Sequence, residues 1–215
     1  MNENDLLWWF GVLHTDGYVY KKDDSIRELR LRVGKQSMMM LIKWKSILDS
    51  LTEKEHKILK EETYDKRYKK YWTSYSIREG SSSALNELIQ KLPTRSLYFN
   101  SEFEGWLKEK RIGAYLAGVI DGDGCIQIRK RYFDKGYEKL LKISDKTPQK
   151  LFTIQQLLLK NMMPKGYVTE YKNHSDLWIY INKEFEKWLR IKVLPHLTLA
   201  HKIERLSSGS LGGEQ

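Results

Sequence analysis

The chain has 215 residues, 40% of them hydrophobic, which is enough for a packed core in one domain or in two fused similar halves. Lys and Arg number 38 and Asp and Glu 28, so the net charge is +10 and nucleic acid is the first partner to consider. The single Cys125 excludes an internal disulfide and a cysteine-built zinc site. No apolar run approaches the ~20 residues of a membrane span, and the N-terminus is acidic where a signal peptide would be basic. We therefore expect a soluble, intracellular protein without a membrane partner, in the cytoplasm or an organelle.

The first half predicts the order helix, two strands, helix, two strands, helix. Residues 27–33 alternate charged and apolar side chains at period two, and 38–51 form an amphipathic helical pattern. Pro93 stops the last helix. The expected helices are 6–14, 38–51 and 84–92, and the expected strands are 18–22, 27–33, 57–62 and 71–77.

The second half repeats this order and adds one helix after Pro195. The expected helices are 112–120, 151–159, 185–191 and 199–206, and the expected strands are 125–131, 137–143, 167–171 and 177–181. We therefore expect one repeat over residues 1–95, a linker over 96–110, a second repeat over 111–206 and a flexible Ser/Gly-rich tail over 207–215.

Two segments half a chain length apart, 9–17 and 116–124, each run from apolar residues into Asp-Gly. This duplication indicates two copies of one unit, each presenting one acid, Asp16 or Asp123, to a shared site. The pattern predicts that each acid lies in the last turn of its helix, which Gly17 or Gly124 ends with a positive φ.

A helix C-terminus is an unfavourable place for a carboxylate, and two of them side by side repel each other. A divalent cation relieves both costs. Ala114, Ala117 and Gly118 provide a small surface on which the two helices can approach closely. Ligation by carboxylates and backbone carbonyls, those of Thr15 and Gly122 among them, fits Mg²⁺ or a similar cation such as Mn²⁺.

At these residues the chain resembles the LAGLIDADG family of homing endonucleases, in the single-chain form with two motifs. The second motif, 116–124, matches closely, and the first retains Gly11, Asp16 and Gly17. The resemblance implies an α+β fold of two pseudo-symmetric αββαββα repeats, whose saddle-shaped antiparallel sheets lie on DNA and are backed by helices. It also implies that Asp16 and Asp123 bind the metal.

The two motifs differ at positions that bear on this resemblance. Asp121 maps onto a structural residue at the helix end, and His14 replaces it in the first half. Phe10 stands where the second motif has Ala117, so we expect the helix pair to pack asymmetrically.

In the family, a polar residue after the second strand of each half orders the attacking water. That position falls on Lys35 and Asp145, which Gln36 and Lys146 follow, and we name Lys35, Asp145 and Lys146 as catalytic candidates. A basic residue near the site typically stabilises the transition state. The candidates for that role are Arg95, Lys130 and Lys202.

The strand alternation predicts which side chains face DNA. Core residues such as Val19, Ile126 and Ile128 alternate with a face that we expect to be cationic throughout. The expected DNA-binding residues are Tyr18, Tyr20, Lys22, Arg30, Arg32, Gln127, Arg129, Arg131 and Lys142. Arg and Gln can read base edges, whereas the lysines hold phosphates.

Some residues have ordinary interpretations. The tryptophans, Trp72 and Trp178 included, are expected in core and sheet packing. His174 is expected to be a surface or packing residue, and the lysines of 66–70 to lie in a solvated loop.

The leading hypothesis is a site-specific endonuclease that binds double-stranded DNA as a monomer and makes a staggered double-strand break by metal-assisted phosphodiester hydrolysis. The alternative is a binding protein of the same fold without cleavage, either an RNA maturase, which has intron RNA as a partner, or a DNA-binding regulator.

Overall fold

A computed structural model describes residues 2–22, 25–80, 83, 86, 112–130, 137–160 and 163–208. The described residues of its first half form two helices, a short 3-10 helix and four strands in the predicted order. They are α1 (Glu3–Thr15), β1 (Gly17–Lys22), β2 (Ser25–Gly34), η1 (Lys35–Ser37), α2 (Met38–Thr52), β3 (Leu59–Asp65) and β4 (Lys70–Glu79). The predicted helix 84–92, apart from Asn86, and the predicted linker 96–110 lie outside the described residues.

The second half follows the same order and confirms the extra helix after Pro195. Its elements are α5 (Ile112–Asp123), β5 (Gly124–Lys130), β6 (Tyr137–Asp145), α6 (Pro148–Lys160), β7 (Tyr167–Glu170), β8 (Ser175–Tyr180), α7 (Lys183–Lys192), η2 (Leu194–His196) and α8 (Ala200–Ser207). In the described part of the chain, no helix is long and apolar enough to cross a membrane.

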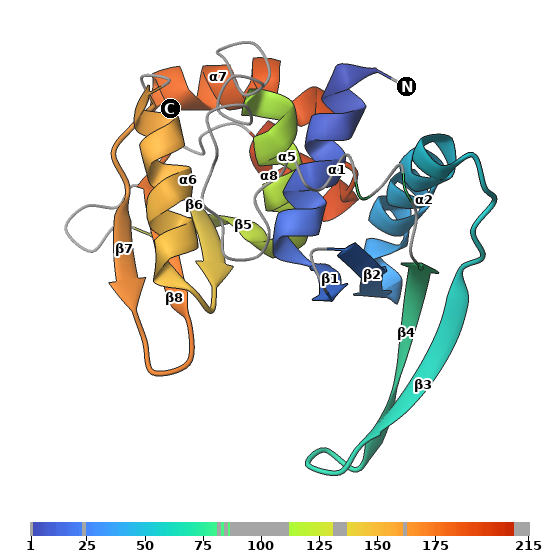
Figure 1. Cartoon of the computed structure of the whole chain (residues 1–215). Helices are drawn as coiled ribbons and strands as arrows, with labels where there is room; N and C mark the ends of the chain where they lie inside the picture. Colours follow the sequence, from blue (N-terminus) through green and yellow to red (C-terminus); the bar gives the residue numbers. More distant parts are fainter. Residues whose placement is uncertain are drawn as a thin grey trace.

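Each half contains one four-stranded antiparallel sheet, and the two sheets share one topology. The strand orders are β1-β2-β4-β3 and β5-β6-β8-β7. In Figure 1 α1 and α5 lie side by side at the centre, the first sheet lies to the right below α2, and the second lies to the left with α6 beside it. The predicted α+β class, with two antiparallel sheets backed by helices, is confirmed.

The alternation predicted for the strands sets the buried face of each sheet. Leu29, Leu31 and Val33 of β2 are buried in the core, while Arg30 and Arg32 point to the other face. Leu141 and Ile143 of β6 are buried in the same way. Each sheet therefore has one apolar face against the helices and one polar face turned away from them.

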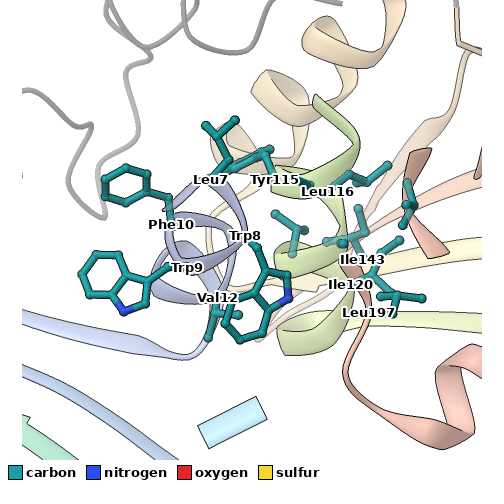
Figure 2. Packing of buried hydrophobic residues seen from close by; sticks show 14 of the residues in the cluster. Leu7, Trp8, Trp9, Phe10, Val12, Tyr115, Leu116, Ile120, Ile143 and Leu197 are labelled. Carbon is teal, nitrogen blue, oxygen red and sulfur yellow. The ribbon is translucent and has the colours of Figure 1, made fainter. Parts of the chain in front are cut away.

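The central helices α1 and α5 approach closely through a glycine from each. A Cβ added at Gly11 would lie 2.2 Å from the Tyr115 carbonyl oxygen, and one added at Gly118 would lie 2.1 Å from the Trp8 carbonyl oxygen. The two glycines occupy equivalent motif positions, so the closest approach is nearly symmetric. Figure 2 shows Phe10 pointing away from α5, so the expected asymmetry from Phe10 is wrong at this contact.

The glycines that follow the two acids are required because they lack a side chain, not because of their backbone conformation. Neither Gly17 nor Gly124 has a φ in the left-handed region, so that expectation is wrong. Instead, the first residue of each strand lies in close contact with the last turn of the preceding helix. A Cβ at Gly17 would lie 2.5 Å from the Leu13 carbonyl oxygen, and one at Gly124 would lie 2.4 Å from the Ile120 Cα. Glycine lets the chain pass directly from helix to strand.

Candidate metal centre and nucleic-acid interface

The two motif acids lie at the C-terminal ends of the central helices. Asp16 caps α1, with its N–H donating to the Val12 carbonyl oxygen at 3.0 Å, and Asp123 is the last residue of α5. Burial raises the pKa of Asp16. Burial, and then the nearby charge of Asp16, raises the pKa of Asp123 to about 6. The fold therefore brings the two predicted acids into one partly desolvated site.

Two buried lysines offset the negative charge at these helix ends. Lys202 of α8 donates to the carbonyl oxygens of Ile120, Asp121 and Gly122 at 2.5, 2.7 and 3.2 Å. Lys150 of α6 donates to the His14 carbonyl oxygen. Because His14 and Asp121 are equivalent motif positions, each helix terminus receives one ammonium group, which opposes its dipole.

Of the three basic candidates, the structure places Lys202 at the acids. Arg95 lies outside the described residues, and Lys130 is exposed at the far end of β5. Lys150 is not among the site residues predicted from the sequence. The available signal was a lysine on the apolar face of helix α6, beside the buried Leu151.

A cavity of about 410 Å³ opens beside Asp123. Four of its lining residues are among the predicted site residues, and four are not. The first four are Thr15, Asp123, Asp145 and Lys146, and the others are Ser144, Thr147, Lys150 and His174. Lys150 pairs with Asp145 at 2.5 Å. His174, expected to be an ordinary residue, lines this cavity and stacks on Tyr171 with 4.7 Å between ring centroids.

The two halves of the site are chemically unequal. Lys35, the residue expected to correspond to Asp145, is exposed in η1 and does not line the cavity beside Asp123. The strand pairing corrects this correspondence: Leu31 pairs with Gly17 as Ile143 pairs with Gly124, so the first-half counterpart of Asp145 is the buried Val33. The second half thus supplies an ion pair where the first half supplies an apolar side chain.

Residues on α1 and α5 cross-link the motif helices in a pseudo-symmetric way. Trp8 Nε1 donates to Asp121 at 2.9 Å, and His14 Nδ1 lies 3.1 Å from the Tyr115 hydroxyl. Asp121 also accepts hydrogen bonds from the backbone N–H and the hydroxyl of Thr198, both at 2.9 Å. This anchors the segment that leads into α8 and Lys202. The structural role expected of Asp121 is confirmed.

The donor atoms at the helix ends fit a hard divalent cation. In the described part of the chain, no group of three or more His, Cys, Asp or Glu residues is arranged to hold a metal. The site offers instead the Asp16 and Asp123 carboxylates and adjacent backbone carbonyls, so water and phosphate would complete the coordination of Mg²⁺ or Mn²⁺. The Gly122 carbonyl oxygen already accepts a hydrogen bond from Lys202. The Thr15 hydroxyl donates to the Gly11 and Val12 carbonyl oxygens at 3.1 and 3.0 Å.

The raised pKa of Asp123 predicts a pH dependence of stability in the metal-free protein. The ordinary pKa is 3.8 and the folded pKa about 6, so the unfolded chain ionises first as pH rises. Stability from this group falls between pH 4 and pH 6, by up to ~3 kcal/mol, and stays constant above. Urea unfolding in EDTA should therefore show that the stabilising effect of Asp123→Asn grows from pH 4 to pH 7. An effect independent of pH would contradict this.

The polar face of the first sheet carries the predicted arginines together with acids. Arg30 lies 5.0 Å from the Tyr18 ring centroid and 3.8 Å from Glu28. Arg32 pairs with Glu61 at 3.4 Å, and it donates to the Ser74 and Thr63 hydroxyls, both at 2.8 Å. Tyr20 and Lys22 are exposed on β1.

The second sheet repeats this arrangement around Trp178. Arg129 pairs with Glu138, and Lys142 pairs with Asp176 at 2.9 Å. Both cations lie near the Trp178 ring, at 5.8 and 5.1 Å from its centroid.

The expectation of a face that is cationic throughout is wrong. Alternation along one strand identifies the face but not what the neighbouring strands place beside each cation. Glu61, Glu138 and Asp176 come from other strands of the two sheets, whereas Glu28 lies on β2 itself, two residues before Arg30. Gln127 is partly buried on β5 next to this cluster, and Arg131 lies outside the described residues.

No protein-family model and no curated protein matches the sequence of the chain. Solved structures do match its fold. The homing endonuclease I-WcaI bound to its DNA recognition sequence aligns with a TM-score of 0.69 and 11% identity, covering 94% of this chain and 86% of that one. Mesophilic variants of the homing endonuclease I-DmoI align with a TM-score of 0.56 and 16% identity, covering 91% and 98%.

Full-length DUF199/WhiA from Thermatoga maritima also aligns, with a TM-score of 0.55 and 14% identity. The alignment covers all of this chain and 63% of that one, so this chain spans less than two thirds of the WhiA length. A separate structure of the N-terminal LAGLIDADG domain of DUF199/WhiA aligns with a TM-score of 0.52. The chain therefore has the LAGLIDADG fold, as the duplicated motif predicted.

Proposed function

We propose that this chain, which has the LAGLIDADG fold, is a site-specific endonuclease that makes a staggered double-strand break in DNA with a divalent cation. The observation that carries the proposal is the meeting of Asp16 and Asp123, both with raised pKa, at the ends of closely packed helices. A fold that only bound DNA would have no need to desolvate two like charges side by side.

The residues of the chain have distinct tasks in this reaction. Asp16 and Asp123 hold the cation, with the carbonyls of Thr15 and Gly122 beside them. When bound, such an ion lowers the pKa of water and stabilises the leaving oxygen of a phosphodiester. Lys150 and Lys202 keep the helix ends in place and limit the negative charge around the ion.

Asp145 and Lys146 line the cavity beside Asp123, where they can hydrogen-bond the attacking water. In the first half the buried Val33 stands in that register, so we assign the task there to the exposed Lys35 that follows it. Because these residues differ between the two halves, each DNA strand of the target would lie next to different side chains.

The polar sheet faces would bind the duplex. Arg30, Arg32, Arg129 and Lys142 each have an acidic neighbour, which holds the side chain in place in the free protein. Phosphates and base edges would compete with these acids for the arginines and lysines, and counterion release would favour the exchange. The similarity to I-WcaI bound to its DNA recognition sequence supports this arrangement.

The alternative is a binding protein of the same fold that does not cleave. The deciding experiment is a cleavage assay on the uninterrupted host-gene junction, with Mg²⁺ or Mn²⁺ and with EDTA. Two cuts that depend on the cation support the endonuclease, whereas tight binding of that DNA without any cut supports the alternative.

Substitutions on the polar faces test the DNA interface. Arg30→Ala and Arg32→Ala should each weaken binding of the specific target by ~1–3 kcal/mol if they read guanine. Lys142→Ala should weaken specific and non-specific DNA alike, because a phosphate contact carries no sequence information. Lys187→Ala, at an exposed position of α7, is the control in the same binding titrations. Unchanged affinity after all three changes would place the interface on another surface.

We expect one copy of this chain to bind one DNA target. The two halves present different side chains at equivalent positions, Tyr18 and Tyr20 against Cys125 and Gln127, so the target should be asymmetric. Sedimentation of the complex should give one chain per duplex. Two chains per duplex, or a target whose halves can be exchanged without loss of binding, would refute this.

A further inference from the structure

The hairpin of β3 and β4, residues 59–79, is longer than its counterpart in the second half, and we call it the β3–β4 arm. Strands β3 and β4 have 7 and 10 residues, whereas β7 and β8 have 4 and 6. Figure 1 shows the arm reaching well beyond the rest of the molecule. Its outer part therefore has no role in covering the core.

The outer part of the arm exposes large aromatic side chains. The exposed fractions are 46% for Tyr64, 69% for Tyr68, 67% for Tyr71 and 51% for Trp72. Trp72 was expected in core and sheet packing; it lies in the sheet, on β4, but outside the core. Tyr64 and Tyr71 face each other across the strands, with 5.0 Å between ring centroids. Stabilisation of the hairpin by a cross-strand aromatic pair accounts for Tyr64 and Tyr71. It does not account for Tyr68, which is exposed in the turn.

The two faces of the arm differ in what they can reach. Trp72 pairs with Thr63, whose hydroxyl accepts from Arg32, so both lie on the polar face assigned to duplex DNA. Tyr64 and Tyr71 lie on the opposite face, because successive residues of a strand point to opposite sides. A duplex on the polar face would leave these two rings free.

The turn of the arm is strongly cationic and ordered. Lys66, Arg67, Lys69 and Lys70 stand against one acid, Asp65. Asp65 accepts from the backbone N–H of Arg67 at 2.9 Å and pairs with its guanidinium at 3.0 Å, which fixes the turn. The turn thus concentrates positive charge next to the exposed rings.

We propose that the β3–β4 arm binds unpaired nucleotides, with Tyr64 and Tyr71 stacking on bases and the lysines of the turn holding phosphates. Inside a duplex the faces of the bases are already stacked, so an exposed ring can stack only on bases that are splayed out or single-stranded. Interleaved aromatic and cationic side chains suit such a strand. An RNA loop and single-stranded DNA share this chemistry. The proposal does not rest on cleavage, since the arm is separate from Asp16 and Asp123.

The test uses the whole protein and three fluorescent 12-mers: oligo(U), oligo(dT) and a blunt mixed-sequence duplex. Anisotropy titrations compare the wild type with the double variant Tyr64→Ala/Tyr71→Ala and with the control Phe152→Ala. Phe152 is 44% exposed on α6, away from the arm. The double variant should bind the single strands about 10- to 100-fold more weakly. Duplex affinity, and all affinities of the control, should change little.

A second variant tests the phosphate contacts. Lys66→Ala/Lys69→Ala should make the negative slope of log affinity against log salt for single strands shallower by about 1.4, because two phosphate contacts are lost. Tighter binding of oligo(U) than of oligo(dT) would identify RNA as the source of the unpaired bases, and equal binding would identify single-stranded nucleic acid in general.

Three outcomes would overturn the proposal. In the first, the wild-type protein does not bind single strands. In the second, the double variant Tyr64→Ala/Tyr71→Ala binds single strands as tightly as the wild type. In the third, the duplex affinity of the double variant falls as much as its single-strand affinity. The last result would make the arm a duplex contact. Thermal melting by circular dichroism should show that each variant remains folded.

Discussion

Replacing Asp16 or Asp123 with Asn is expected to abolish cleavage of both strands while leaving target binding intact. An amide keeps the size of the side chain but removes the charge that the cation requires, and both acids would serve a shared site. The measurement is single-turnover cleavage of a target labelled on each strand, in Mg²⁺ and in Mn²⁺, together with binding in Ca²⁺. Asp5→Asn, at the other end of α1, is the matched control and should cut normally.

Stability separates this loss of function from misfolding. Because burial and mutual repulsion disfavour the ionised form, Asp123→Asn should be as stable as the wild type, or more stable, at pH 7 without metal. A single variant that still cut both strands at a near-normal rate would refute the shared site. A variant that lost both binding and stability would assign the acid a structural role instead.

Replacing Gly118 with Ala should destabilise the protein by ~3 kcal/mol or more, because the new methyl group would meet the Trp8 backbone at a distance that no rotamer change can relieve. Gly11→Ala should behave alike, since its Cβ would meet the Tyr115 carbonyl oxygen. Gly80→Ala is the control, because a Cβ there has no neighbour within 4 Å. Urea unfolding with EDTA measures all three.

The same substitution should affect the metal site as well. Moving α1 and α5 apart separates Asp16 from Asp123, so variants that remain folded should bind the cation more weakly. The rise in melting temperature on adding Mn²⁺ measures this effect. Gly118→Ala with both wild-type stability and a wild-type response to Mn²⁺ would show that the helices do not meet as the structure has them.

Local pattern determined a large part of this protein in advance. The order of helices and strands followed from hydrophobic periodicity and from Pro and Gly positions, which act within a few residues of the chain. The duplicated Asp-Gly ends placed Asp16 and Asp123 at helix termini, and alternation in β2 placed Arg30 and Arg32 on the polar face. Each of these features depends on neighbours in the sequence.

The tertiary structure decided which distant residues complete the site. Lys150 reaches the end of α1 from α6, and His174 enters the cavity from the turn before β8. The acids beside Arg32 and Lys142 come from other strands of the same sheets. Position 11 must be glycine because the backbone of Tyr115 on α5 lies against it, and nothing within α1 requires a glycine there. Contacts between residues far apart in the sequence leave no periodic signal in one chain, since they arise only when packing sets the helices and sheets against each other.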